Sequence, residues 1–248
     1  MSDKTTHFGF EEIPVGEKAR RVDAVFDSVA QRYDLMNDLM SLGLHRVWKH
    51  FAVHLARVRK GMRVLDLAAG TGDLSLRLAP MVGRCGQVVL ADSNRPMLVK
   101  GRDRLLDRGH VGTIEAVRCD AQGLPFPDRV FDRVLIGFGL RNITHKELAL
   151  AEMRRVLRPS GMALVLEFSR FTLPALAPIY DLWSFRALPR IGEAVVGDAD
   201  SYRYLAESIR RHPDQESLLA AMGDAGFERR SYHNLCGGVV AVHKGFRL

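Results

Sequence analysis

Hydrophobic and polar positions change their period near residue 60, and this change divides the chain into two parts. Before it, Val22, Val25, Phe26 and Val29 follow the i, i+3, i+4, i+7 spacing of one buried helix face. After it, short apolar runs alternate with segments of helical period. The pattern therefore predicts helices over residues 18–58 and a succession of strands and helices beyond them.

The second part predicts alternating strands and helices. Apolar, β-rich runs predict strands at 63–68, 87–92, 114–119, 133–138 and 162–168, with helices at 73–80, 94–108 and 146–157. The last of these helices should end before Pro159, because the residue preceding a proline disfavours α geometry. A final helix over 214–225 and two strands at 227–235 and 238–246 complete the series. Such alternation predicts a mostly parallel sheet with helices on both faces.

Residues 171–205 interrupt the alternation. They are rich in apolar, aromatic and proline residues, among them Pro174, Trp183 and Pro189. We interpret them as a lid inserted into an α/β domain, with basic residues Arg186 and Arg190 within it. The expected organisation is an N-terminal helical cap over 1–60 and a main domain over 61–248 that carries the lid at about 171–205.

Composition narrows the functional classes. The 248 residues are 47% hydrophobic and 26% charged, as in ordinary globular proteins, and the net charge is +7. Basic residues occur in short pairs, which favours scattered surface charge over a nucleic-acid site. No apolar run approaches the roughly 18 residues of a membrane span, and residues 1–7 do not resemble a secretory signal, so a cytoplasmic location is expected. The three cysteines are too widely spaced to suggest a metal cluster or a disulfide framework, and we expect no metal.

A glycine turn follows the first predicted strand of the main domain. Gly70 and Gly72 would bring the backbone close to a ligand, between the carboxylates of Asp66 and Asp73. A dinucleotide fingerprint would need a third glycine at Ser75, and the carboxylates would repel a pyrophosphate. The same carboxylates suit S-adenosylmethionine, which has an ammonium and a sulfonium group and no phosphate.

The ends of the next strands carry further polar residues. Asp92 lies 20 residues after Gly72, where an acid can bind both ribose hydroxyls, and Ser93 follows it. Asp120 and Ala121 follow the third strand, in the usual place for contacts to adenine. Three strand ends in series therefore predict a binding site for S-adenosylmethionine.

A motif upstream of the glycine turn indicates which class of S-adenosylmethionine-binding protein this chain resembles. Tyr33-Asp34-Leu35-Met36-Asn37-Asp38-Leu39-Met40-Ser41, followed by His45 and Trp48, resembles the signature of the ubiquinone/menaquinone biosynthesis C-methyltransferase family. Phe138-Gly139-Leu140-Arg141-Asn142 and Arg155–Gly161 are also similar to family motifs, although Arg158 and Ser160 stand where lysine and glycine are typical. The resemblance extends from about Lys18 to the C-terminus.

The resemblance implies a fold, an activity and contacts. The fold is the class I methyltransferase fold, Rossmann-like and α/β, with a mostly parallel seven-stranded sheet and a terminal antiparallel strand. The activity is C-methylation of demethylmenaquinol, of a 2-polyprenyl-6-methoxy-benzoquinol, or of both. The implied cofactor contacts are Thr71, Asp92, Asp120, Ala121 and the backbone of Gly137. Tyr33, Asn37, Trp48 and Tyr202 are expected to contact the substrate.

The chemistry requires that a quinol hydroxyl lose its proton, and a phenol has a pKa of roughly 10. Arg141 follows the fourth strand and could stabilise a developing phenolate, while Asn142 could orient a quinol oxygen. His45 is the candidate base by residue type. The alternatives are that Arg141 pairs with a carboxylate such as Asp34 or Asp66, and that His45 is structural.

The substrate class implies partners. A polyprenyl quinol resides in the bilayer, so we expect the enzyme to work at the membrane surface, with the lid receiving the isoprenoid tail. A homodimer and a quinone-biosynthesis assembly are left open, and no nucleic acid is expected. The rival functions are an RNA methyltransferase, a small-molecule O- or N-methyltransferase on the same fold, and a non-catalytic subunit that binds S-adenosylmethionine.

Overall fold

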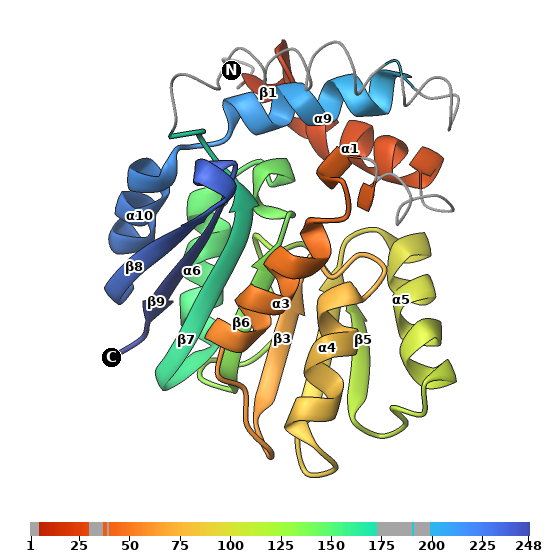
Figure 1. Cartoon of the computed structure of the whole chain (residues 1–248), viewed down its shortest axis with the longest axis vertical. Coiled ribbons are helices and arrows are strands. Elements are labelled where there is room, and N and C mark those ends of the chain that lie inside the picture. The colour runs from red at the N-terminus through yellow and green to blue at the C-terminus, as the bar shows by residue number, and fades with distance from the viewer. Residues whose placement is uncertain (1–4, 30–36, 39, 173–189, 191–198) are drawn as a thin grey trace.

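A computed structural model describes residues 5–29, 37–38, 40–172, 190 and 199–248 (Figure 1). Its centre is a seven-stranded sheet in the order β5-β4-β3-β6-β7-β9-β8. The strands are β3 (Arg63–Leu67), β4 (Gln87–Asp92), β5 (Ile114–Arg118), β6 (Phe131–Gly137), β7 (Leu157–Phe168), β8 (Glu228–Leu235) and β9 (Val240–Phe246). Strands β3 to β7 pair in parallel, and β9 runs antiparallel to both β7 and β8. The predicted class I methyltransferase fold, with its late antiparallel strand, is confirmed.

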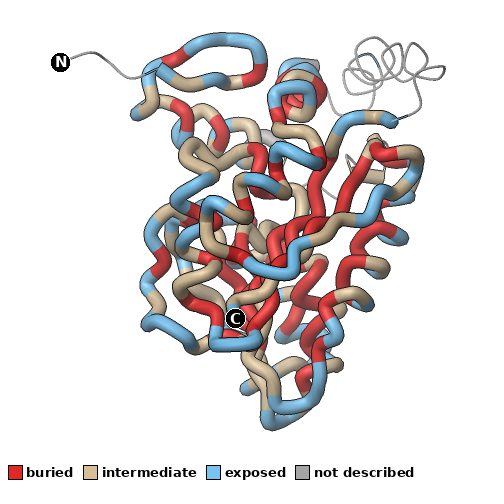
Figure 2. Tube along the Cα trace, turned by 90° about the vertical axis from the view of Figure 1, so that its left-hand side faces the viewer, coloured by how far each residue is buried: buried red, intermediate tan, exposed pale blue. Residues whose placement is uncertain are grey.

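Helices cover both faces of the sheet, as Figure 1 shows. They are α3 (His45–Leu55), α4 (Asp73–Val82), α5 (Arg95–Asp107), α6 (Lys146–Val156) and α10 (Gln215–Asp224), and α1 (Val15–Val29) and α9 (Ala199–Arg211) lie beyond one end of the sheet. Alternate strand residues enter two separate cores. Val64 and Leu135 pack with α3, α4 and α5, whereas Leu65 and Val134 pack with α6 and α10. Figure 2 shows the buried residues concentrated in these layers.

Local sequence signals explain where two of the helices begin. The side chain of Asn94 accepts a hydrogen bond from the Met97 N–H at 3.0 Å, and Pro96 lies in the first turn of α5. Asp214 accepts from the Ser217 N–H at 2.9 Å and caps α10 in the same way. Both helices begin within one residue of the predicted starts at 94 and 214.

The N-terminal residues differ from the predicted helical cap. β1 (Thr5–Phe8) and β2 (Glu11–Pro14) form an antiparallel hairpin before α1. Gly9 has a φ of 60° and makes the turn possible. The hairpin packs on α9, where the Phe8 ring stacks on Tyr204 with centroids 4.2 Å apart and the Phe10 N–H donates to Glu207 Oε2 at 3.0 Å. These contacts span nearly 200 residues of sequence, so helical periodicity could not reveal them.

The predicted lid boundary is also corrected. Residues 199–205 belong to α9, which continues to Arg211, because Tyr202, Leu205 and Ala206 form one buried face at helical spacing. Of the remaining predicted lid, 173–189 and 191–198 lie outside the described residues, Arg186 among them, and Arg190 is exposed.

Strand β7 begins at Leu157, five residues earlier than predicted, and passes through Pro159. Ser160, with a φ of 64°, donates its N–H to the carbonyl oxygen of Arg247, and this pairing at the chain end stabilises the extension. Within the described part of the chain, no helix is both long enough and apolar enough to cross a membrane.

Candidate functional site

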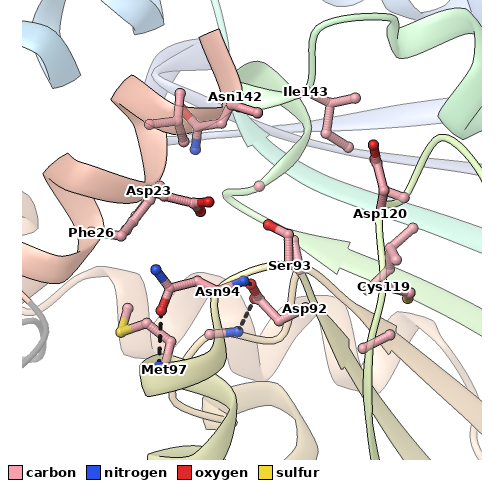
Figure 3. Close-up of a pocket in the computed structure, with 18 of the residues that line it drawn as sticks. Asp23, Phe26, Asp92, Ser93, Asn94, Met97, Cys119, Asp120, Asn142 and Ile143 are labelled. Atoms are coloured by element: carbon pink, nitrogen blue, oxygen red, sulfur yellow. Dashed lines mark hydrogen bonds between the residues drawn. The ribbon is translucent and has the colours of Figure 1, made fainter. Parts of the chain in front are cut away.

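A cavity lies where the loops after β3, β4, β5 and β6 meet, with α1 across its opening (Figure 3). It combines carboxylates, small residues and a few large apolar groups. Its lining is Ala19, Val22, Asp23, Phe26, Leu67, Ala68, Gly70, Ala91, Asp92, Ser93, Asn94, Met97, Cys119, Asp120, Ala121, Gln122, Gly137, Phe138, Gly139, Asn142, Ile143 and Thr144. Seven predicted site residues therefore come together here: Gly70, Asp92, Ser93, Asp120, Ala121, Gly137 and Asn142.

Asp92, at the end of β4, is the central carboxylate of the cavity. Its Oδ2 accepts from the Gly70 N–H at 2.7 Å and its Oδ1 accepts from the Asn94 N–H at 2.8 Å. The strand end, the glycine turn and the start of α5 are thereby fixed to one side chain. Burial raises the pKa of Asp92 above its ordinary value, although the backbone donors oppose the shift. Each oxygen retains a lone pair with which it can accept a further hydroxyl.

Asp120 lies on the opposite wall, after β5. Its Oδ1 accepts from the Gln122 N–H at 2.9 Å, and the Gln122 amide also donates to the carboxylate. These bonds hold Asp120 and Ala121 at the rim of the cavity. Burial raises the pKa of the neighbouring Cys119 thiol to about 11, with smaller contributions from the charges of Asp92 and Asp120.

Helix α1 supplies two residues that sequence reasoning missed. Asp23 points its carboxylate into the cavity, and Phe26 lies one turn further along the helix (Figure 3). Burial raises the pKa of Asp23, and the nearby Asp27 adds to the shift. Asn94 Nδ2 donates to Asp27 Oδ1 at 2.8 Å and so ties α1 to the start of α5. The available signal was a carboxylate inside the otherwise apolar stripe of Val22 and Phe26.

The charged residues that line the cavity are all acidic. Asp23, Asp92 and Asp120 line it, and none of the described lining residues is lysine, arginine or histidine. A pyrophosphate would be repelled here, whereas a ligand with cationic groups would be attracted. These three carboxylates therefore fit the sulfonium and ammonium of S-adenosylmethionine and do not fit the pyrophosphate of a dinucleotide.

Two strained backbone turns form the floor. Ala68 after β3 and Phe138 after β6 have φ values of 52° and 59°, in the left-handed region that non-glycine residues seldom adopt. A Cβ on Gly139 would lie 2.5 Å from the Ala68 Cβ, so only glycine allows these two turns to approach. Gly137 contributes backbone to the lining of the cavity.

Asn142 enters the cavity from the short 3₁₀ turn η1 (Leu140–Asn142) (Figure 3). The hydroxyl of Tyr204 in α9 donates to its Oδ1 at 3.0 Å. Because the amide oxygen is occupied in this way, the amide nitrogen is left to donate to a ligand. Tyr204 was not among the predicted site residues. Tyr202, which was, is 1% exposed in the core and does not line the cavity.

Arg141 does not line this cavity, although Asn142 beside it does. Its Nη1 lies 2.8 Å from Glu167 Oε1, and its backbone N–H donates to Glu167 Oε2 at 3.2 Å. The side chains are 5% and 1% exposed. The guanidinium also donates to the Phe138 carbonyl. Arg141 thus has a carboxylate partner, as the alternative interpretation held, but the partner is Glu167 and not Asp66.

Three predicted cofactor residues lie behind the cavity wall. Asp66 is fully buried, where its Oδ2 accepts from the N–H and the hydroxyl of Ser75 at 2.9 and 2.6 Å. Burial raises its pKa to about 7. Gly72 is the residue before α4, with a φ of 74°, and a Cβ there would lie 3.2 Å from the Gly101 Cα. Thr71 is 1% exposed, and its hydroxyl has no partner in the described structure.

The upstream motif is mostly structural in its described part. His45 Nε2 lies 2.8 Å from Asp38 Oδ1, and burial nevertheless lowers the pKa of His45. Trp48 is 4% exposed, donates to Cys236 Sγ at 3.2 Å and packs behind Phe138. Neither residue lines the cavity, nor does the half-buried Asn37. Tyr33 and Asp34 lie outside the described residues, so the predicted role of Tyr33 stays a prediction.

Comparison with known proteins gives a consistent result. Residues 15–247 match the model of the ubiE/COQ5 methyltransferase family. The chain is 59% identical over 248 residues to the ubiquinone/menaquinone biosynthesis C-methyltransferase UbiE of Cellvibrio japonicus, covering 100% of each chain. It is 56% identical over 247 residues to the Coxiella burnetii (strain RSA 331 / Henzerling II) protein of the same name, covering 100% of this chain and 99% of that one.

Solved structures agree at the level of the fold. An Aquifex aeolicus SAM-dependent methyltransferase has a TM-score of 0.59 at 17% identity, covering 81% of this chain and 89% of that one. A Thermotoga maritima SAM-dependent methyltransferase has a TM-score of 0.64 at 18% identity, covering 91% and 99%.

Proposed function

The chain belongs to the ubiE/COQ5 methyltransferase family, and on this premise we propose that it transfers the methyl group of S-adenosylmethionine to a ring carbon of a polyprenyl quinol. The acceptor is demethylmenaquinol, a 2-polyprenyl-6-methoxy-benzoquinol, or both. The observation that carries the proposal is the acidic cavity at the strand ends, because its charge suits this cofactor. The rival functions predicted from sequence are not favoured by the close, full-length similarity to UbiE proteins.

We assign cofactor contacts from the lining of the cavity. Bound S-adenosylmethionine would supply an electrophilic methyl group. The backbone amides that fix Asp92 hold its carboxylate where ribose hydroxyls can donate to it, with Ser93 alongside. Asp120 and Ala121, which line the same cavity, would contact the adenine edge. Asp23 adds a second carboxylate beside Asp92, which strengthens the attraction for a cation.

The acceptor carbon becomes a nucleophile when a neighbouring hydroxyl loses its proton. A hydrogen bond donated to the resulting phenolate favours the ionised form. Asn142 is the residue to which we assign this role, since Tyr204 occupies its oxygen and leaves its nitrogen free to donate. Arg141 is then a positioning residue. Its bonds to Glu167 and to Phe138 hold the turn from which Asn142 projects.

Other predicted residues take less direct parts in this proposal. Trp48 would act through Phe138, against which it packs. His45 is engaged by Asp38, so its predicted role as a base requires that this contact break. Contacts of Tyr33 and Asn37 with the quinol remain proposals, and a role for Tyr202 would be exerted through the packing of α9.

A polyprenyl substrate suggests that the protein works at a membrane surface, and we propose peripheral association. Leu42 and Val47 flank the start of α3 and are 73% and 62% exposed. With the neighbouring Leu44 they offer apolar side chains to an interface. We also propose that copies of the chain associate into a dimer, or that the chain associates with other quinone-biosynthesis enzymes. Sedimentation with vesicles, with Leu42→Ser/Val47→Ser as the variant, tests the membrane part.

Product analysis tests the methyl transfer. The reduced naphthoquinol and benzoquinol are each incubated with methyl-labelled S-adenosylmethionine, and the label is located by NMR. A new carbon–carbon bond at the ring is expected. Label on oxygen would transfer the assignment to an O-methyltransferase, and cofactor binding without turnover would support a non-catalytic subunit. Asn142→Ala should lower kcat by at least about tenfold without weakening S-adenosylmethionine binding.

A further inference from the structure

A second cavity, of about 190 Å³, lies on the other side of Thr144 from the acidic cavity. It is lined by residues of the N-terminal hairpin, α1, η1, the start of α6 and α9. Figure 1 shows β1, α1 and α9 together beyond one end of the sheet. Its lining includes Thr6, Lys18, Arg141, Thr144, Lys146 and Arg211. The hydrogen bond between Tyr204 and Asn142 forms part of the wall between the two cavities.

The charge of this second cavity is opposite to that of the first. Lys18, Lys146, Arg141 and Arg211 line it, and its described lining contains no carboxylate. Glu167 is the partner of Arg141, and Glu167 and Glu147 both interact favourably with Lys146. Two carboxylates therefore face the four cationic groups, and a net positive charge remains.

Lys18 is the group that this arrangement leaves unsatisfied. The residue is 5% exposed, no carboxylate among the described residues contributes to its electrostatics, and its described contacts include no hydrogen bond or ion pair of the ammonium. Burial lowers the pKa of Lys18 to about 8, and the charge of Lys146 contributes. A largely buried lysine without an anionic partner is costly, and proteins seldom retain one without a counter-ion.

Neutral donors accompany the cations. Thr6 and Thr144 bring hydroxyl groups to the same walls. Helix α6 begins at Lys146, runs for 11 residues and has no side-chain cap among the described contacts. Its first-turn amides add positive potential, which Glu147 in the same turn partly offsets. Lysine, arginine, hydroxyl and helix-end amides together are the groups that recognise an oxyanion with several acceptor atoms.

We propose that this cavity binds a phosphate group, whether of a free phosphate or of a lipid headgroup, and that Lys18 is its principal ligand. The phosphate oxygens accept from Lys18, Lys146 and Arg211, and they supply the counter-charge that Lys18 lacks. The site is separate from the acidic cavity, which repels phosphate. It does not depend on methyl transfer, so binding of S-adenosylmethionine serves as an independent check of folding.

Calorimetric titration with inorganic phosphate, at constant ionic strength set by chloride, tests the site on the full-length protein. The expected result is saturable binding that Lys18→Met weakens about tenfold or more, since one charge-assisted hydrogen bond is lost. Lys18→Arg should retain binding, and Lys60→Met, at an exposed lysine before β3, should leave it unchanged. Without phosphate, Lys18→Met should unfold at the same temperature as the parent protein or a higher one. Absence of saturable binding, or equal binding by Lys18→Met, would overturn the proposal.

Vesicles distinguish the two sources of phosphate. Binding to phosphatidylglycerol vesicles is compared with binding to phosphatidylcholine vesicles, for the parent protein, Lys18→Met and Lys60→Met. The site is assigned to a headgroup if two results hold. Lys18→Met alone loses the phosphatidylglycerol preference, and added inorganic phosphate lowers the binding of the parent protein to phosphatidylglycerol vesicles. Equal loss in both variants assigns the preference to general surface charge and leaves free phosphate as the ligand measured by titration.

Discussion

Replacing Glu167 with glutamine should destabilise the protein strongly. Glu167 Oε1 accepts from Arg141 Nη1 at 2.8 Å and from the Phe168 N–H at 2.9 Å, and Oε2 accepts from the Arg141 N–H at 3.2 Å. Glutamine has nearly the same size and keeps one acceptor oxygen. It replaces the other oxygen with an NH₂ group and removes the charge that balances Arg141.

The expected magnitude follows from burial. With side chains 5% and 1% exposed, neither charge of the pair can be compensated well by solvent. Removing one partner of a buried ion pair typically costs about 3–5 kcal/mol. For a chain of this size, about 3 kcal/mol corresponds to a fall in Tm of roughly 6–12 °C.

Urea unfolding followed by circular dichroism measures the free energy of unfolding. Asp103→Asn is the matched control, because the Arg102–Asp103 pair is 47% and 51% exposed and should change stability by less than about 0.5 kcal/mol. The double variant Arg141→Met/Glu167→Leu should recover much of the loss. A Glu167→Gln protein within about 1 kcal/mol of the parent would refute the inference that this pair holds the turn.

Three further perturbations test the acidic cavity and its surroundings. Asp92→Asn should raise the dissociation constant for S-adenosylmethionine by about tenfold, measured by calorimetry, because one carboxylate acceptor and its charge are lost. Gly139→Ala should lower the free energy of unfolding by about 1–3 kcal/mol, whereas Gly123→Ala, where a Cβ meets nothing within 4 Å, should not. Asp66 has a pKa of about 7 when folded, so the folded state binds its proton more tightly than the unfolded chain does. Stability from this group is therefore present at low pH and is lost as pH rises from about 4 to 7, by at most about 1.4 kcal/mol per unit, and Asp66→Asn should flatten that slope.

Much of the main domain could be predicted from local sequence. The run 87–92 has an apolar centre and is bounded by turn residues. Asn94 and Asp214 are residue types that cap helices, and both do so here. The hairpin over 5–14 could not be predicted in this way. Its position depends on contacts of Phe8 and Phe10 with α9, which no local pattern encodes.

The site was predictable where it depends on strand ends. Asp92, Asp120 and Gly137 reach the cavity because parallel strands bring their carboxyl ends to one edge. The positions of the other site residues depend on contacts between residues far apart in the sequence. Asp23 arrives from a helix far upstream, and Arg141 is turned away from the cavity by Glu167, 26 residues later in the chain.

The central claim is methylation of a quinol ring carbon with S-adenosylmethionine as the donor. Its most direct test is transfer of label from S-adenosylmethionine to demethylmenaquinone and to the methoxy-benzoquinone, side by side, each in reduced and oxidised form. The account predicts label in the ring only under reducing conditions, because only the quinol can lose a hydroxyl proton to activate the carbon. Equal labelling of the oxidised quinones, or no labelling of either quinol by a protein that binds S-adenosylmethionine, would contradict it.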